Sequence, residues 1–296
     1  MRIGYPCINR GIGCTANSGF RLASYSEERL VQKVENNLNC LFRILQYNVQ
    51  NGFYFFRISS DLVPFASHPV CTFDWAGHFR EQFRKVGKFI KEHNIRISMH
   101  PDQFVLINAL KNDVVERSIR ELEYHDTILN EMDLDRTAKI QIHVGGVYDD
   151  KQGAIERFVD RHKFLDPSLK RRLVIENDDR LFSLENCLSV HEKTNIPILF
   201  DVFHHQCLNK GESLRMGLEL AGQTWKKSDG VLMVDYSSQQ PGHRLGTHAK
   251  SIDLQLFHEF LKQSEGLDFD IMLEIKDKEK SGLKALEVLE EFRKAS

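Results

Sequence analysis

The feature that most constrains the fold is a repeated unit, in which a short apolar segment is followed by a segment with helical periodicity. Eight such units follow one another without a change in composition. The apolar segments are near-continuous runs, as in parallel strands covered on both faces, and occupy residues 2–9, 52–62, 95–100, 139–146, 172–177, 196–203, 230–238 and 269–277. The helix-like segments are residues 27–47, 75–93, 111–132, 151–164, a short stretch from 183, 211–224, 252–263 and 280–294.

Eight strand-then-helix units in 296 residues predict an α/β protein, a single (β/α)8 TIM barrel in which residues 1–296 form one domain. The main alternative is an open, doubly wound sheet. It is disfavoured because no G-x-G-x-x-G motif follows the first strand-like segment. In a barrel the active site lies at the carboxyl ends of the strands, so the residues that follow each apolar run are the ones to inspect.

The composition is that of a globular chain, with 41% hydrophobic residues to build a core. No apolar run reaches the roughly 20 residues of a membrane span, and no long apolar segment follows a basic start. We therefore expect a cytoplasmic protein with no membrane partner, and a monomer. The six cysteines form no C-x-x-C pair, which favours free thiols over disulfides or zinc–thiolate sites.

The net charge of −2 counts against a general nucleic-acid binder, because such proteins usually carry a basic excess. Any nucleic-acid function must then depend on a local basic patch. Basic residues do occur at or just after the ends of the strand-like segments, namely Arg10, Arg21, Arg57, Arg244, Lys250, Lys276 and Lys278.

Metal-capable side chains stand where the strand-like segments end. One histidine in such a place is more often a hydrogen-bonded structural residue than a ligand. Three carboxylates directed at one barrel mouth, however, would repel one another and raise one another's pKa unless cations neutralised them. The carboxylates are Glu176, Asp201 and Glu274, and the imidazoles that could join them are His100, His143, His204 and His248.

This mixture of carboxylate and imidazole groups suits zinc, manganese or iron. The groups exceed what one tetrahedral ion needs, so a central carboxylate such as Glu176 could bridge two ions. Two ions close together can hold the attacking and the leaving oxygen of a phosphoryl transfer. The pattern therefore predicts metal-activated hydrolysis of a phosphodiester.

Several stretches, in order along nearly the whole chain, resemble the UV-damage endonucleases, relatives of the endonuclease IV and xylose-isomerase-like barrels. They are IGYPCIN, FRISSDLVPFASH, SMHPDQF, IHVGG, VIENDD, FDVFHH and LEIKDKEKS. The resemblance implies a TIM barrel with a cluster of two to three divalent ions, manganese first, with magnesium, cobalt or zinc as alternatives. It also implies a DNA repair endonuclease that cuts damaged double-stranded DNA immediately 5′ to UV photoproducts, with abasic sites as a further candidate substrate.

The resemblance also implies ligands. These are His100, His143 and Glu176 for a first ion, Glu176, Asp201 and Glu274 for a second, and His204 and His248 for a third, with His68 as an additional candidate. Glu176, Glu274 and Lys276 are the expected catalytic residues. Gln103 and Phe104 match a pair that the family wedges into the duplex. The other expected DNA contacts are Tyr5, Asn9, Arg10, Arg57 and Lys278.

The chain departs from the family on the seventh strand-like segment. Where the family typically has Lys-x-His, this sequence reads Met233-Val234-Asp235. Methionine cannot neutralise phosphate, whereas Asp235 could still bind a metal through oxygen and would favour harder ions such as manganese or magnesium.

Two other functions compete with the endonuclease. A sugar isomerase or epimerase could use the same barrel, but it would need a closed polar pocket, and the Gln103–Phe104 loop and the rim arginines argue against one. A non-catalytic sensor of DNA damage is motivated only by Met233, and would bind lesions without cutting them.

Overall fold

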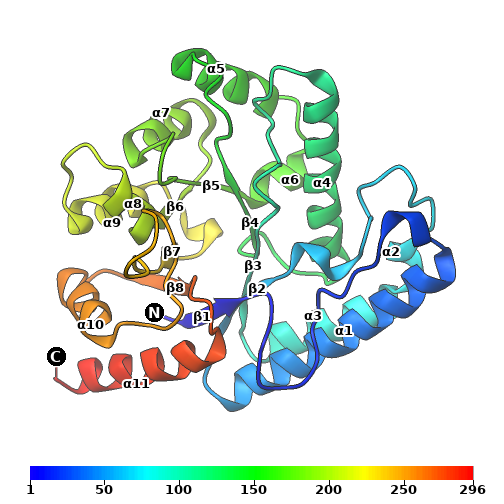
Figure 1. The fold of residues 1–296 in the computed structure, drawn as a ribbon, viewed down its shortest axis with the longest axis horizontal. Helices are drawn as coiled ribbons and strands as arrows, with labels where there is room; N and C mark the ends of the chain where they lie inside the picture. Colours follow the sequence, from blue (N-terminus) through cyan, green and yellow to red (C-terminus); the bar gives the residue numbers. More distant parts are fainter. Residues whose placement is uncertain (296) are drawn as a thin grey trace.

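The computed structural model describes residues 1–295 and shows eight parallel strands closed into a barrel, which confirms the predicted (β/α)8 fold (Figure 1). Each strand pairs with its neighbours in the sequence, and β1 pairs with β8 to close the ring. The strands are β1 (Ile3–Pro6), β2 (Phe55–Ile58), β3 (Arg96–Met99), β4 (Lys139–His143), β5 (Leu173–Glu176), β6 (Ile198–Asp201), β7 (Leu232–Tyr236) and β8 (Phe269–Leu273).

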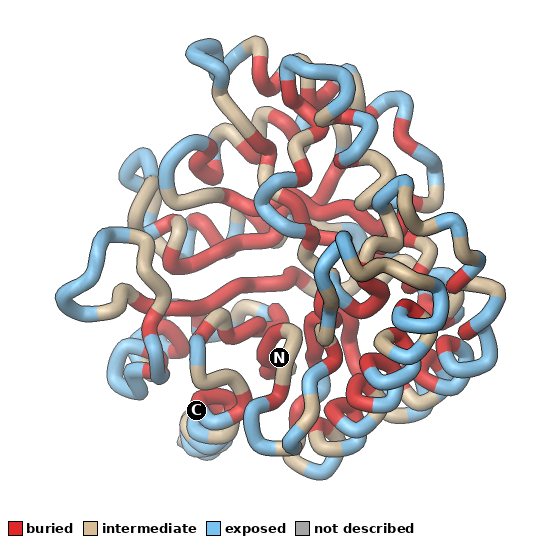
Figure 2. The backbone as a smooth tube through the Cα atoms, turned by 45° about the vertical axis from the view of Figure 1, so that its right-hand side comes forward, coloured by how far each residue is buried: buried red, intermediate tan, exposed pale blue. Residues whose placement is uncertain are grey.

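Helices surround the barrel, and their inward faces are buried while their outward faces are exposed (Figure 2). They are α1 (Glu27–Gln50), α2 (Trp75–His78), α3 (Arg80–Glu92), α4 (Asn112–Glu131), α5 (Lys151–His162), α6 (Pro167–Arg172), α7 (Leu184–Thr194), α8 (Val202–Cys207), α9 (Leu214–Gln223), α10 (Leu254–Gln263) and α11 (Glu279–Ala295). Short 3-10 turns occupy η1 (Leu22–Ser24), η2 (Ser60–Leu62) and η3 (Lys227–Asp229).

The sequence signals explain most of these boundaries. Ser26 caps α1 by accepting a hydrogen bond from the backbone N–H of Arg29. The helix expected over residues 75–93 is divided into α2 and α3, because the backbone of Phe79, between them, is not helical. The strand expected over 196–203 ends earlier, because the Asp201 side chain accepts from the backbone N–H of His204 and so starts α8.

The barrel interior is layered because side chains alternate along a strand, so that residues two apart point to the same side. One apolar layer consists of Phe55, Val174, Leu199, Met233 and Met272, all fully buried. Two residues further along each of these strands, or just past its end, stands a polar side chain, respectively Arg57, Glu176, Asp201, Asp235 and Glu274. The apolar layer is therefore the floor on which the polar groups of the barrel mouth rest.

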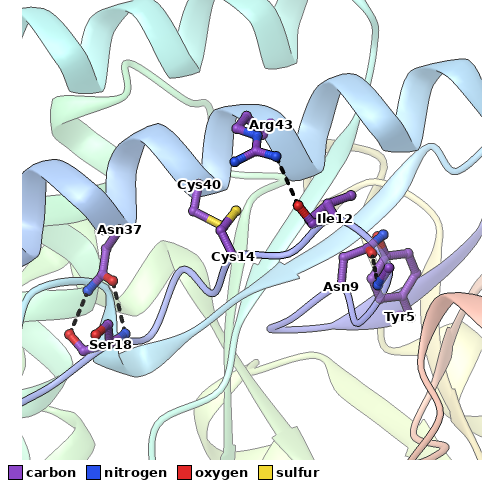
Figure 3. Close-up of a disulfide and its surroundings, with 9 residues drawn as sticks. Tyr5, Asn9, Ile12, Cys14, Ser18, Asn37, Cys40 and Arg43 are labelled. Atoms are coloured by element: carbon purple, nitrogen blue, oxygen red, sulfur yellow. Dashed lines mark hydrogen bonds between the residues drawn. A yellow bond between two sulfur atoms is a disulfide. The ribbon is translucent and has the colours of Figure 1, made fainter.

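A disulfide joins Cys14 to Cys40, with their Cα atoms 5.9 Å apart, so the expectation of free thiols is wrong for these two residues. Sequence spacing could not reveal the bond, because the loop after β1 folds back over α1 only in the tertiary structure (Figure 3). Asn37 and Arg43 of α1 also bond the same loop, at Ser18 and Ile12. Cys7, Cys71, Cys187 and Cys207 are free. Within residues 1–295, no helix is long and apolar enough to cross a membrane.

Candidate metal centre

Three imidazoles converge on the buried carboxylate of Glu176 at the end of β5. Its Oε2 lies 3.4 Å from Nε2 of His100 and 3.7 Å from Nε2 of His143, while its Oε1 lies 3.0 Å from Nδ1 of His204. His100 directly follows β3, His143 ends β4, and His204 is carried by α8 just after β6. One carboxylate thus faces side chains from three other strand ends with both of its oxygens, as a bridging ligand would.

The described residues contain three groups of potential metal ligands. Within each group, the ligand atoms lie within 4.8 Å of one another. Because Glu176 and Asp201 each belong to two of them, the groups form one continuous cluster. The groups are His100, His143 and Glu176; Glu176, Asp201 and His204; and Asp201, Asp235 and Glu274.

Two of the expected ligands lie apart from these groups. His248 is beside the cluster, with its Nδ1 3.7 Å from Oε2 of Glu274 and its ring 5.8 Å from that of His204. His68 lies outside it. Its side chain is exposed and its Nδ1 accepts a hydrogen bond from the backbone N–H of Val70, so this structure does not bring His68 to the centre.

A buried arginine holds the carboxylates on the far side of the cluster. Arg57, on β2, is only 3% exposed, and its Nη2 lies 2.7 and 2.8 Å from the two oxygens of Asp235. Its Nη1 donates to Glu274. Gln141 of β4 accepts from Nη2 of Arg57 at 2.7 Å and donates both to Asp235 and to Glu176. These bonds tie the two halves of the cluster into one network.

The electrostatics of the cluster favour a bound cation. Burial raises the pKa of Asp201 to about 8, against the opposing charge of His204, and Glu176 and Glu274 raise it further. Burial would also raise the pKa of Glu176, but the facing imidazoles outweigh burial and hold it well below its usual range. Asp201 Oδ2 and the Nδ1 atoms of His100 and His143 are buried without a hydrogen-bond partner. A cation bound beside Asp201 would relieve the repulsion among these carboxylates, and the nitrogen and oxygen donors suit a divalent transition metal.

Asn177 fixes the geometry of α8 and was not singled out in the sequence. Its amide accepts from the backbone N–H of Asp201 and donates to the Asp201 carbonyl, and its own carbonyl lies 3.0 Å from Nδ1 of His204. Gln141 was also missed. Its position two residues before His143 placed it on the same side of β4, and this spacing was the available signal.

Two hollows open on either side of the cluster, and both are lined by Gln103, His143 and Gly246. One has a volume of about 540 Å³ and is bounded on its outer side by Asp178, Asp179, Arg180 and Arg244. The other, of about 620 Å³, is lined in addition by His100, His248, Glu274, Lys276 and Lys278. The mouth is therefore an open, mixed-charge trough rather than a closed pocket.

The Gln103–Phe104 segment stands at the edge of this trough. Gln103 is exposed between the two hollows, and the Phe104 side chain is 72% exposed. Lys276 and Arg10 are also exposed on the same side, where Nε of Arg10 donates to the Lys276 carbonyl. These four side chains are accessible to a large ligand at the mouth.

The structure does not support DNA contacts by Tyr5, Asn9 or Arg57. Tyr5 is fully buried and its hydroxyl bonds the side chains of Asn48 and Asn9, while Asn9 itself is 2% exposed. Arg57 lines the second hollow, but its terminal nitrogens are already bonded to the carboxylates of Asp235 and Glu274. Tyr5 and Asn9 were expected as DNA contacts from the family resemblance and Arg57 also from its place near a strand end, and neither signal reveals that the side chains are buried.

The sequence model of a family described as "UV-endonuclease UvdE" matches residues 2–296. A curated UV DNA damage endonuclease from Clostridium perfringens (strain 13 / Type A) is 39% identical over 296 residues, which are 99% of this chain and 72% of the relative. The crystal structure of SacUVDE superposes with a TM-score of 0.95 at 44% identity and covers 99% of both chains.

A D-psicose 3-epimerase from Clostridium cellulolyticum H10 superposes with a TM-score of 0.56 over 97% of both chains, at 12% identity. Such a low identity shows a shared barrel and nothing about the reaction, because one barrel fold supports many chemistries.

Proposed function

We propose that this chain, which belongs to the UV-endonuclease UvdE family, is a metal-dependent DNA repair endonuclease that hydrolyses the phosphodiester bond immediately 5′ to UV photoproducts. Abasic sites are a further candidate substrate. The observation that carries the proposal is the Glu176 carboxylate facing three imidazoles at the mouth of the barrel. Residues 1–296 would act as one endonuclease domain.

The residues that would hold metal are those with free ligand atoms around Glu176. His100, His143 and Glu176 would bind one ion, and Glu176, Asp201 and His204 another. Bound divalent ions, manganese first, supply Lewis acidity for the scissile phosphate and lower the pKa of water. The chain's part is to fix the ligands, which Gln141 does for Glu176 and Asn177 does for His204.

Glu274 and Lys276 would act from the opposite wall of the trough. Burial would raise the pKa of Glu274, but Arg57 outweighs it and holds the pKa at about 2, so Glu274 is ionised at neutral pH. Lys276 is exposed beside it and can pair with a phosphate of the bound strand. Lys278 and Arg10 extend this positive edge.

Gln103 and Phe104 would fill the gap that a displaced lesion leaves in the duplex. Moving a poorly stacked photoproduct out of the helix costs less free energy than moving normal bases, which gives selectivity for damage. An exposed aromatic ring can then stack in the vacated space. The trough beside it is open and would receive damaged duplex DNA as the partner of a monomeric, cytoplasmic enzyme.

The test is incision of a duplex oligonucleotide that carries one pyrimidine dimer, assayed with Mn²⁺ and with chelator, and with the cut mapped to the nucleotide. We expect a nick immediately 5′ to the dimer, which chelator abolishes. Glu176→Gln should lower the rate by at least about 10³-fold, because it removes the central carboxylate. Glu192→Gln, the same change on the exposed face of α7, is the matched control and should be neutral.

Other results would point elsewhere. Tight binding of the dimer without a nick in any divalent metal would favour the damage sensor. Turnover of a ketose with neither binding nor nicking would favour an epimerase. A nick at full rate by Glu176→Gln would refute the assignment of this carboxylate.

A further inference from the structure

We infer that Arg57 is a built-in cation of the metal centre, so that the chain binds two divalent ions and uses Asp235 to hold Arg57 rather than to bind metal. This inference rests on the metal dependence proposed above. It concerns the number of ions and the role of Asp235. The sequence predicted two to three ions and allowed Asp235 to be a ligand.

The contacts of Asp235 are the first argument. Both of its oxygens face Nη2 of Arg57, at 2.7 and 2.8 Å, and Oδ2 also accepts from Gln141 at 2.7 Å. The carboxylate is fully buried, so its oxygens have no route to solvent. An ion that bound Asp235 would have to share these oxygens with the guanidinium, and its positive charge would lie directly against that of Arg57.

Arg57 cannot easily be displaced. Its side chain is 3% exposed. Its second terminal nitrogen, Nη1, donates to Glu274, so both terminal nitrogens of the guanidinium are bonded to carboxylates. A guanidinium does not lose its proton in proteins, so it cannot make room by becoming neutral. Moving it would leave a buried charge unpaired, which is strongly unfavourable.

The free ligand atoms lie on the other side of the cluster. Oδ2 of Asp201 is buried without a hydrogen-bond partner and has only Nδ1 of His204 near it, at 3.4 Å, whereas both oxygens of Asp235 face Arg57. The groups around Glu176 therefore have atoms available for two ions. In the third group, made of Asp201, Asp235 and Glu274, two of the three members are already paired with Arg57.

The charge balance leads to the same number. The cluster contains four carboxylates, those of Glu176, Asp201, Asp235 and Glu274, and Arg57 contributes one positive charge. Two divalent ions would leave about one positive charge in the cluster, which one phosphodiester of bound DNA neutralises. Three ions would leave about three positive charges in a buried site.

The experiment counts Mn²⁺ per chain by equilibrium dialysis and elemental analysis, without DNA. We expect about two equivalents for the wild type and for Asp235→Asn. Arg57→Lys should also bind two, because the charge is kept, while Arg57→Gln should gain about one. Glu176→Gln is the positive control and should lose at least one equivalent.

Three saturated sites in the wild type would overturn the inference. So would loss of an equivalent in Asp235→Asn, or a count of two in Arg57→Gln. Circular dichroism of each variant establishes that the barrel is intact, and the isosteric Asp235→Asn variant answers the question if Arg57→Gln fails to fold. Two ions without a nick would refute the proposed reaction and leave this inference standing, whereas no bound metal would refute both.

Discussion

Reduction of the Cys14–Cys40 disulfide should lower the thermal stability of this protein without changing its fold. The bond closes a loop with a sequence separation of 26 residues. Its loss returns loop-closure entropy to the unfolded chain, which lowers the free energy of unfolding by about 3.5 kcal/mol in the chain-entropy model. The folded loop keeps its bonds from Asn37 to Ser18 and from Arg43 to Ile12, so little should change in the native state (Figure 3).

The expected shift in Tm follows from the length of the chain. An unfolding entropy of about 2.1 cal/mol/K per residue gives about 0.6 kcal/mol/K for 296 residues. A loss of about 3.5 kcal/mol therefore lowers Tm by about 6 °C. The assay is a thermal melt with and without reductant, paired with a count of thiols in denaturant, which should rise from the four free cysteines to six.

A Cys14→Ala, Cys40→Ala double variant is the control, because reductant should not change its Tm. Six thiols before reduction would refute the disulfide itself. A rise from four to six thiols with a Tm shift below about 1 °C would refute the entropic reasoning while leaving the bond in place.

Phe104→Ala should weaken binding of dimer-containing duplex by about tenfold or more in a gel-shift assay, because base stacking on an aromatic ring contributes about 1–3 kcal/mol. Phe164→Ala is the control, since this residue is 88% exposed, and it should leave binding unchanged. Lys276→Ala should reduce the slope of log K against log salt concentration by about 1, the effect of one lost phosphate contact, and an unchanged slope would remove Lys276 from the DNA interface. Burial, with Lys170, lowers the pKa of His162 to about 4, so the unfolded chain takes up a proton below pH 6.5 that the folded chain does not. The contribution of His162 to the free energy of unfolding should therefore be fully present above pH 6.5 and should fall as the pH drops, by about 2 kcal/mol at pH 4.5. Urea unfolding of His162→Gln should lack this part of the slope, and the exposed control His243→Gln should retain it.

The barrel and the position of its polar centre could be predicted because both depend on local patterns. Apolar runs alternating with helical periodicity specify the fold class, and a parallel barrel brings every strand's carboxyl end to one side. The sequence therefore predicts that His100, His143 and Glu176 lie near one another, and the structure places them so.

Contacts across the barrel could not be predicted in this way. Arg57 and Asp235 are separated by 178 residues and lie on β2 and β7, which are not neighbours in the sheet. Their pairing depends on the shear and width of the closed barrel, which no local pattern specifies. The same limit applies to the Cys14–Cys40 bond and to Gln141, whose polar side chain in a buried strand gave no sign of its partners.

The departure at Met233 has a simpler meaning in the structure than in the sequence. Met233 lies in the apolar layer with Phe55 and Val174, two residues below Asp235 on the same side of β7. It therefore fills the barrel floor and does not reach the mouth, where the charge that a lysine would supply is already present in Arg57. The charge that is absent at position 233 is thus supplied by Arg57, which weakens the motivation for the sensor hypothesis. Restoring a lysine there should place a second buried cation under Asp235 and destabilise the fold, since an ammonium in an apolar layer is strongly disfavoured without a partner of its own.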